Sequence, residues 1–245
     1  MRAVPSDVMV GTKHQTKHCG ELEIIDYINA KNIRVKFVAT GYEGTTQAVH
    51  IRRGSVRDVL APTVRGVGYI GIGKYKPSES RIDNPEYILW RSILQRCYSK
   101  EFQIRAPTYI GCSVHTDWLN YQNFAEFYHK NYVDGYHLDK DLLVIGNKQY
   151  GPNTCVFVPH WLNTFVLNGG SSSDIGSGFN ASMGKYVCRC HDMGEIRHIG
   201  YFETSEDAHT AWLDFKLGLA LKHKPEIDAI DCRLYQNTVS IINTL

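Results

Sequence analysis

Three basic side chains near the C-terminus, Lys185, Arg189 and Arg197, lie in β-rich segments and have the chemistry to bind nucleic acid. A guanidinium donates two parallel hydrogen bonds to guanine, so Arg189 and Arg197 are the residues expected to read bases. Residues an even number of positions apart on a strand share a face of the sheet, which places Lys185 with Arg189. We predict that both arginines share the sheet face turned away from a covering helix.

A second group, His137, Asp139 and His160, has side chains suited to holding a metal ion. One carboxylate and two histidines bind a divalent cation loosely, which suffices for magnesium because that ion keeps several of its waters. The alternative interpretation is that the three are ordinary surface or hydrogen-bonding residues. The residue pattern leaves both interpretations open.

Three strands are predicted around the first group. Gly178–Ala181 and Lys185–His191 are the first two strands, joined by the tight turn Met183-Gly184. Glu195–Phe202 is the third, after a turn at residues 192–194. The expected product is a small antiparallel sheet.

A helix is predicted after the third strand, because apolar residues recur at i, i+3, i+4 and i+7 from Ala208 to Phe215. Thr204, followed by Asp207, fits an acidic form of the capping box. This order resembles the Apetala/ethylene-response-factor DNA-binding domain over about forty residues, and the resemblance implies a sheet lying in the DNA major groove. The matching residues are Gly178-Phe179, Tyr186–Cys190, Ile199–Phe202, Thr204, Glu206, Ala208, Ala211-Trp212 and Asp214.

The middle of the chain predicts two helices, Pro85–Tyr98 and Asp117–Tyr132, with apolar residues at helical spacing. Their aromatic residues are interpreted as core rather than as a base-stacking platform. Residues 85–170 also resemble bacteriophage proteins of the HNH and homing endonuclease type. The motifs that carry this resemblance, in order, are Trp90–Tyr98, Pro107–Phe127 and Leu138–Asn163.

An HNH nuclease holds one divalent metal ion between a β-hairpin and a helix. The resemblance implies that His137 is the general base, that Asp139 matches the Asp two residues later, and that His160 and Asn163 match the H-x-x-N of the helix. Asp139 and His160 would hold Mg²⁺ or Mn²⁺ if the site is active. These four residues form the candidate catalytic site.

Two residues depart from the HNH pattern. Tyr136 stands where the family has a metal-binding Asp or His, and Thr154 stands where it has the Asn that orients the base. Asn153 could replace that Asn only after a strand slip, which would reverse its side-chain direction. We therefore expect a nuclease fold that binds DNA with weakened or absent cleavage.

The N-terminal segment predicts a small β-barrel with one basic face. β-rich runs occur at Glu21–Tyr27, Ile33–Ala39 and Gln47–Ile51, separated by turn-prone residues. Arg34 and Lys36 alternate with apolar residues, so they are expected to face away from the core and to contact DNA. The arrangement is similar to the five-stranded Src-homology and chromo barrels.

Positive charge is concentrated in the N-terminal third. Residues 1–80 contain 12 Lys and Arg against 7 Asp and Glu, whereas residues 171–245 contain 7 against 10. Since phosphate neutralisation supplies most non-specific affinity for DNA, the N-terminal third is expected to add backbone contacts. The alternative is that this excess is ordinary surface charge.

The remaining composition indicates a folded protein of a reducing compartment. Seven cysteines without a C-x-x-C pair predict free, mostly buried thiols and disfavour a zinc site. No apolar run is long enough to span a membrane, and the N-terminus lacks the apolar region of a signal peptide. We expect a cytoplasmic protein, in the host cytoplasm if it is encoded by a phage.

The expected fold class is α+β, with three domains. These are a small barrel and connector (1–80), a helical and HNH-like ββα domain (81–170), and an Apetala-like DNA-binding domain with a C-terminal tail (171–245). The expected function is double-stranded DNA binding by a phage or mobile-element protein derived from a homing endonuclease. The alternatives are an active metal-dependent HNH endonuclease and a factor that binds a host or phage protein; a homodimer is also left open.

Overall fold

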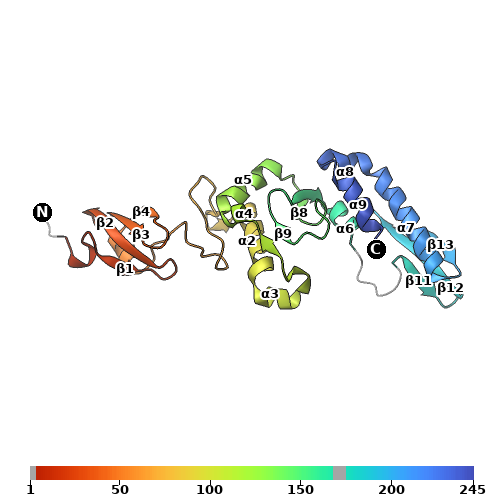
Figure 1. Cartoon of the computed structure of the whole chain (residues 1–245), viewed down its shortest axis with the longest axis horizontal. Coiled ribbons are helices and arrows are strands. Elements are labelled where there is room, and N and C mark those ends of the chain that lie inside the picture. The colour runs from red at the N-terminus through yellow and green to blue at the C-terminus, as the bar shows by residue number, and fades with distance from the viewer. Residues whose placement is uncertain (1–3, 168–174) are drawn as a thin grey trace. The chain divides into compact units, whose positions relative to one another are not determined.

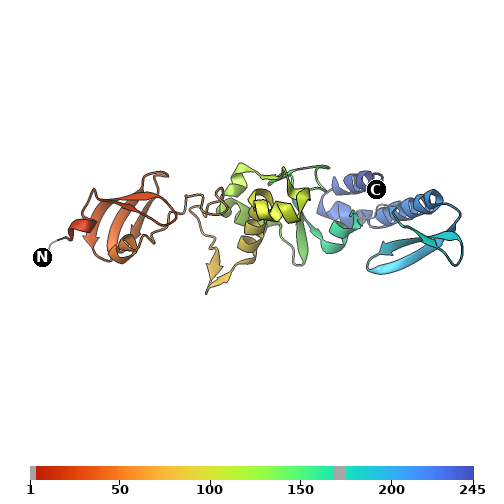
Figure 2. The same cartoon turned by 90° about the horizontal axis from the view of Figure 1, so that it is seen from below.

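The computed structural model describes residues 4–167 and 175–245 of the 245-residue chain (Figures 1 and 2). The chain divides into two compact units, Met1–Lys130 and Asn131–Leu245. The α+β class is confirmed, because each unit contains both helices and antiparallel strands. The expected boundary at 80/81 falls inside the first unit, and the one at 170/171 lies outside the described residues, so the three-domain division stays a prediction.

The first unit begins with an antiparallel sheet of four strands. Its order is β1-β2-β3-β4, so each strand pairs with its sequence neighbours and β1 and β4 are the two edges. The sheet is open, and the expected closed barrel is not found among the described residues. The bounds are Lys13–Gln15 for β1, Glu21–Asn29 for β2, Asn32–Phe37 for β3 and Glu43–Thr46 for β4, after a short 3-10 helix at Ser6–Val8.

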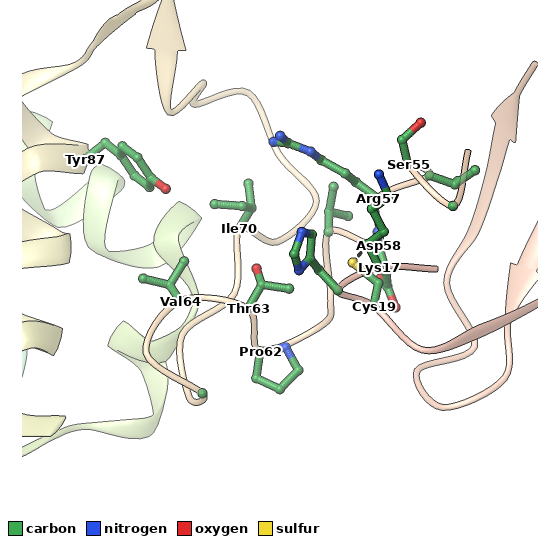
Figure 3. Close-up of a pocket in the computed structure, with 15 residues that line it drawn as sticks. Lys17, Cys19, Ser55, Arg57, Asp58, Pro62, Thr63, Val64, Ile70 and Tyr87 are labelled. Atoms are coloured by element: carbon green, nitrogen blue, oxygen red, sulfur yellow. Dashed lines mark hydrogen bonds between the residues drawn. The ribbon is translucent and has the colours of Figure 1, made fainter. Parts of the chain in front are cut away.

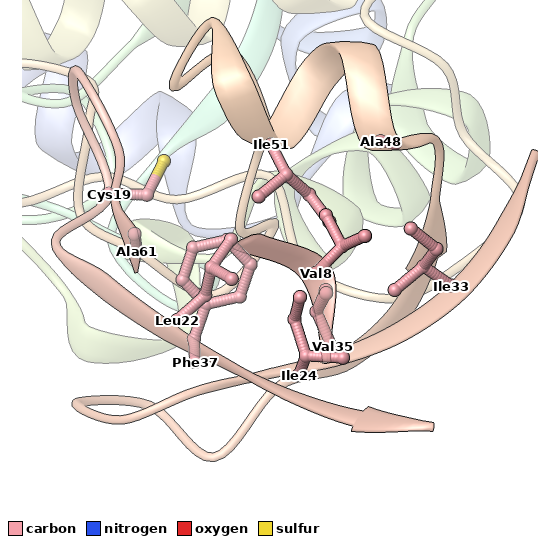
Figure 4. Packing of buried hydrophobic residues seen from close by; sticks show 10 residues of the cluster. All are labelled: Val8, Cys19, Leu22, Ile24, Ile33, Val35, Phe37, Ala48, Ile51 and Ala61. Carbon is pink, nitrogen blue, oxygen red and sulfur yellow. The ribbon is translucent and has the colours of Figure 1, made fainter. Parts of the chain in front are cut away.

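The segment Gln47–Ile51, expected as a strand, forms most of helix α1 (Ala48–Arg52) instead. Ala48 and Ile51 are three residues apart, which places them on one face of a helix but on opposite faces of a strand. Both are buried and join the core beneath the sheet (Figure 4). Burial of both side chains therefore selects the helix. The same core contains Val8, Leu22, Ile24, Ile33, Val35 and Phe37.

Four helices complete the first unit. The predicted helix over Pro85–Tyr98 (α2) is confirmed at both ends. The predicted helix over Asp117–Tyr132 is divided at Asn120, which is extended and bridges to Tyr69. Most of the aromatic side chains of these predicted helices are buried in the core, as interpreted. The remaining bounds are α3 Lys100–Arg105, α4 Thr116–Leu119, α5 Tyr121–Asn131, β5 Ser78–Glu79, β6 Ile82–Asp83, β7 Ser113–Val114 and a 3-10 helix at Pro107–Tyr109.

The second unit opens with a two-stranded antiparallel hairpin followed by a helix. Strand β8 (Tyr136–Asp139) pairs with β10 (Val156–Pro159), and α6 (His160–Phe165) begins directly after β10. A long connection that includes the short strand β9 (Gln149–Tyr150) joins the two paired strands. The structure therefore has a ββα arrangement at the expected place in the chain.

A three-stranded antiparallel sheet packed on a long helix follows. Its order is β11-β12-β13, with bounds Ser177–Asn180, Lys185–Asp192 and Glu195–Phe202. Helix α7 (Ser205–Lys222) packs on one face of the sheet (Figure 1). This sheet and helix confirm the fold predicted for the region.

The segment expected as a C-terminal tail folds into two helices, α8 (Lys224–Ile230) and α9 (Leu234–Ile242). Ile227 and Leu234 are fully buried in one cluster with Val158 and Leu162 of the ββα segment. Asn237 also donates hydrogen bonds from Nδ2 to the carbonyls of residues 142 and 143, at 2.8 and 2.9 Å. The last two helices thus complete the core of the ββα segment.

The seven cysteines are free thiols, and all but Cys232 are buried, as predicted. Burial raises the pKa of Cys155 to about 12 and that of Cys188 to about 11, so neither thiol is a reactive thiolate near neutral pH. Among the residues that the structure describes, no helix has the length and apolarity needed to cross a membrane.

Candidate nucleic-acid interface and ββα motif

The three-stranded sheet has one covered face and one open face. On the covered face, Cys188 and Cys190 of β12 are buried against Trp212 of α7. Alternation along β12 turns Lys185, Val187, Arg189 and His191 to the open face. Lys185 and Arg189 therefore share this face, as predicted.

The prediction that Arg197 shares a face with Arg189 is wrong. Arg189 pairs with His198, whereas Arg197 pairs with Cys190. Directly opposed residues of neighbouring strands lie on one face, so Arg197 is on the side that α7 covers. The cause is a β-bulge beside Cys188 and Arg189, which shifts the register by one residue and reverses the alternation on β13.

The same bulge changes the assignment of the aromatic residues on β13. Tyr201 pairs with Val187 on the open face and is 42% exposed. Its ring packs against His198, with 4.8 Å between ring centroids. Ile199, two residues before Tyr201, packs into the core beneath α7 instead. His198 and Tyr201 are thus open-face residues that strict alternation from the sequence did not identify.

The three basic candidates differ in how far their charge is already neutralised. Lys185 Nζ lies 2.7 Å from a carboxylate oxygen of Glu203. Arg197 pairs with two carboxylates, those of Glu195 at 2.8 Å and Asp192 at 3.4 Å. Within residues 4–167 and 175–245, no ion pair involves the exposed Arg189. Arg189 is therefore the cation of this sheet that is best placed to meet an external anion.

The ββα motif brings the two candidate histidines together. His137 on β8 pairs with Val158 on β10, and His160 begins α6 two residues after Val158. The ring centroids of His137 and His160 lie 4.9 Å apart, and both side chains are exposed. The hairpin and helix therefore position these two side chains together, although 23 positions separate them in the sequence.

Asp139 lies on the same strand face as His137, but its carboxylate has a local structural role. Its Oδ1 accepts hydrogen bonds from the backbone N–H groups of Asp141 and Leu142, each at 2.7 Å. Burial outweighs these two bonds and raises the pKa of Asp139 above its ordinary value. The carboxylate thus closes the turn that follows β8.

The other residues of the motif occupy fixed positions around the histidines. Asn163 follows His160 by three residues on α6 and is half-buried. Thr154 precedes β10, and its hydroxyl donates to the Gln149 carbonyl at 2.7 Å. Tyr136 alternates with His137 and so points to the opposite face of β8. Neither departure from the HNH pattern supplies a metal ligand.

The residues present do not fit a bound Mg²⁺ or Mn²⁺. In the described part of the chain, no three His, Cys, Asp or Glu side chains are grouped so that they could hold a metal ion. Asp139, the carboxylate expected to bind the ion, has one oxygen engaged by two backbone N–H groups. We therefore derive no chemical step through a metal ion at this site.

Arg34 and Lys36 of β3 face away from the core, as predicted. Both basic groups pair with Glu43 on the neighbouring strand, at 3.2 Å for Arg34 and 3.4 Å for Lys36. Exposed pairs of this kind contribute little to stability, but the carboxylate offsets part of the positive potential on this face. The basic face of β3 is therefore weaker than the sequence pattern indicates.

Comparison with known proteins adds no family assignment, because no family model, curated protein or solved structure gives a significant match to this chain.

Proposed function

We propose that this protein binds double-stranded DNA through the open face of the β11–β13 sheet. The observation that carries the proposal is the exposed Arg189 on that face, without an ion pair to any described residue, on a sheet that α7 braces from behind. A β-ribbon is narrow enough to enter the major groove, where an arginine can recognise guanine by two hydrogen bonds.

The open face also carries charged and polar side chains, which suit a hydrated interface with DNA. Lys185 lies at one end, with its charge shared with Glu203. His198 and Tyr201 supply ring nitrogens and a hydroxyl that can hydrogen-bond to phosphates, to base edges or to bridging waters. Only one cation of the sheet is unpaired in the described structure, so we expect modest affinity from this sheet alone.

We further propose that the ββα motif is an HNH-derived scaffold with weakened or absent cleavage. Two observations support this: the carboxylate of Asp139 is engaged in a turn, and Tyr136 and Thr154 supply no metal ligand. Without a metal ion to polarise the phosphate, a histidine base alone contributes only part of the rate that phosphodiester cleavage needs.

A fluorescence-anisotropy titration tests the DNA-binding proposal. Labelled duplexes of random and selected sequence are titrated with the full-length protein at several salt concentrations. We expect affinity that falls linearly with log salt, and enrichment of a subset of sequences that contain guanine. No duplex binding at low salt by folded protein would overturn the proposal and favour a protein partner for the same face.

The second candidate function is that of an active metal-dependent endonuclease. It is favoured by one observation, the contact of the His137 and His160 rings within a ββα arrangement. A plasmid-nicking assay in Mg²⁺ and in Mn²⁺ separates it from the first proposal. Cleavage by the wild type that is lost in His137→Ala would make the endonuclease the better assignment.

A further inference from the structure

A pocket of about 680 Å³ in the first unit collects basic side chains from two distant segments (Figure 3). Lys17 and His18 come from the turn between β1 and β2, and Arg57 comes from the segment after α1. All three side chains are exposed, whereas Ile70 and Tyr87 also line the pocket and are half-buried. The pocket thus has a charged rim and a more apolar wall.

Backbone hydrogen bonds hold the two basic segments together. Lys17 donates from its N–H to the Gly54 carbonyl at 2.9 Å. The Asp58 N–H donates to the Cys19 sulfur at 3.4 Å. Gly54 has a φ of +61°, and a Cβ there would lie 3.2 Å from the Gln15 carbonyl oxygen, so this close approach requires glycine. The backbone segments that carry Lys17 and Arg57 are therefore held together before any ligand binds.

The charge of these side chains is not neutralised within the described structure. No ion pair among residues 4–167 and 175–245 involves Lys17, His18 or Arg57. Four other cations of residues 4–60 do have carboxylate partners: Lys13 pairs with Glu21, Arg34 and Lys36 pair with Glu43, and Arg52 pairs with Asp7. Lys31 and Arg53 have no ion pair among the described residues. The pocket therefore carries unpaired positive charge, whereas the cations of the β3 face are paired.

The pocket also contains one carboxylate, that of Asp58, which is 4% exposed. Asp58 accepts hydrogen bonds from the Thr40 hydroxyl and, at 2.7 Å, from the Leu60 N–H. These partners keep it as a structural acceptor beneath the rim. An anion at the rim therefore meets the cations of Lys17 and Arg57 first.

We infer that this pocket binds a backbone phosphate of DNA. Tyr87 is poorly available for base stacking, because its ring packs on Trp90 and lies beneath the Arg91 guanidinium. Charge at the rim and the lack of a free aromatic face fit a phosphodiester better than a base. This inference rests on the proposed DNA binding and assigns it a second contact point, in the first unit.

The test compares two double variants that each remove two positive charges from the first unit. Lys17→Ala with Arg57→Ala removes the pocket cations, and Arg34→Ala with Lys36→Ala removes the paired cations of β3. Each phosphate contact contributes about 0.9 to the slope of log K against log salt for duplex DNA. We expect the pocket variant to lower the slope by about 0.9, the value of one phosphate contact, and the β3 variant to leave it nearly unchanged. Equal thermal midpoints would show that both variants are folded.

Two further titrations test whether the bound phosphate belongs to DNA or is free in solution. Inorganic phosphate and a mononucleotide are titrated separately into the wild type and the pocket variant by NMR chemical-shift mapping. We expect no saturable binding of either at millimolar concentration, because the pocket is one contact of a longer strand. Tight binding of free phosphate that depends on Lys17 and Arg57, with an unchanged DNA slope, would overturn the assignment to DNA.

The failures of the two proposals are distinguishable. If the wild type binds duplex DNA but the pocket variant keeps the full salt slope, the pocket inference is wrong and the sheet remains the DNA contact. If the wild type binds no duplex DNA at all, both the proposed function and this inference are overturned.

Discussion

At the scale of single residues, Asp139 shows that a side chain can match a motif in position while its carboxylate is already used in a local turn. Its position two residues after His137 matches the HNH pattern. Its carboxylate instead accepts hydrogen bonds from the N–H groups of Asp141 and Leu142, and the residue is half-buried. A spacing pattern records only sequence position, so it could not reveal this competing use of the oxygen.

Substitution of Asp139 separates its structural role from metal binding. Asp139→Asn keeps an acceptor oxygen for the turn, whereas Asp139→Ala leaves the two N–H groups without it, at a cost of about 1–3 kcal/mol in the free energy of unfolding. We expect the Asn variant to retain near wild-type stability at pH 7 and the Ala variant to be less stable by that amount. Urea denaturation measures both. Equal losses in both would show that the carboxylate charge itself is required.

The raised pKa of Asp139 also predicts a pH dependence. A carboxyl group whose pKa is raised on folding stabilises the folded state below its unfolded pKa, and this contribution is lost as the pH rises through the folded value. The stability of the wild type relative to Asp139→Asn should therefore fall as the pH is raised from about 3.5, just below the ordinary aspartate pKa. Denaturation of both proteins across that range measures this difference, with Asp214→Asn, at an exposed aspartate far from Asp139 in the sequence, as the control. A difference that grows with pH would contradict the direction of the shift.

Arg189 and Arg197 form a matched pair for testing the DNA contact. Both are exposed arginines of one sheet, but they lie on opposite faces, and only Arg197 pairs with carboxylates in the described structure. We expect Arg189→Ala to weaken binding to a preferred duplex by about 1–3 kcal/mol and Arg197→Ala to have little effect. Anisotropy titrations at one salt concentration measure both, and a larger loss in the Arg197 variant would place the interface on the other face.

At the scale of elements, hydrophobic spacing predicted the main helices and strands but did not predict local irregularities. The helix Pro85–Tyr98 and the strand before Met193 follow the expected periods. The β-bulge beside Arg189 does not, because a bulge depends on the pairing of two strands and not on either sequence alone. The face of Arg197 was therefore not predictable from a period of two.

Short segments were the other source of error. Gln47–Ile51 is rich in β-formers, yet it forms part of a helix because Ala48 and Ile51 must both reach the core. The segment taken as a tail folds because Ile227 and Leu234 fill the apolar side of the ββα segment. In both cases tertiary packing outweighs local propensity.

The cap of α7 was predicted from sequence and can be tested directly. The Thr204 hydroxyl accepts the Asp207 N–H at 3.1 Å and contacts the Asp207 carboxylate at 2.7 Å. Thr204→Ala should lower the free energy of unfolding by about 1 kcal/mol, because it removes the N-cap acceptor. Thr210→Ala, within the same helix, is the control and should cost little because alanine favours the helix interior. Thermal denaturation of both variants measures the difference, and equal stabilities would show that the cap is not required.

At the scale of the whole molecule, the chain distributes its candidate DNA contacts over two units while its net charge is only +2. The candidate contacts that have no carboxylate partner in the described structure are Lys17 and Arg57 in the first unit and Arg189 in the second. Charge counts by segment predicted a basic N-terminal third, but not which of its cations are neutralised by carboxylates. That distinction depends on strand pairing, as for Arg34 and Lys36 with Glu43.

Binding and cleavage should therefore be separable in this molecule. Cleavage requires an activated water within about 3 Å of a polarised phosphate, and the described residues bring His137 and His160 together without a group that could hold a metal ion. We expect negligible cleavage of a preferred duplex in Mg²⁺ or Mn²⁺, and unchanged duplex affinity in His137→Ala.

The measurement combines a nicking assay with an anisotropy titration on the same preparations, and Arg189→Ala is the control that should lose binding. Because Asp139 is committed to its turn, we also expect Tyr136→Asp with Thr154→Asn to bind DNA without restoring efficient cleavage. Metal-dependent cutting by the wild type, abolished in His137→Ala, would instead mean that Asp139 is released from the turn when DNA binds. The ββα motif would then be a working catalytic site that assembles only on its substrate.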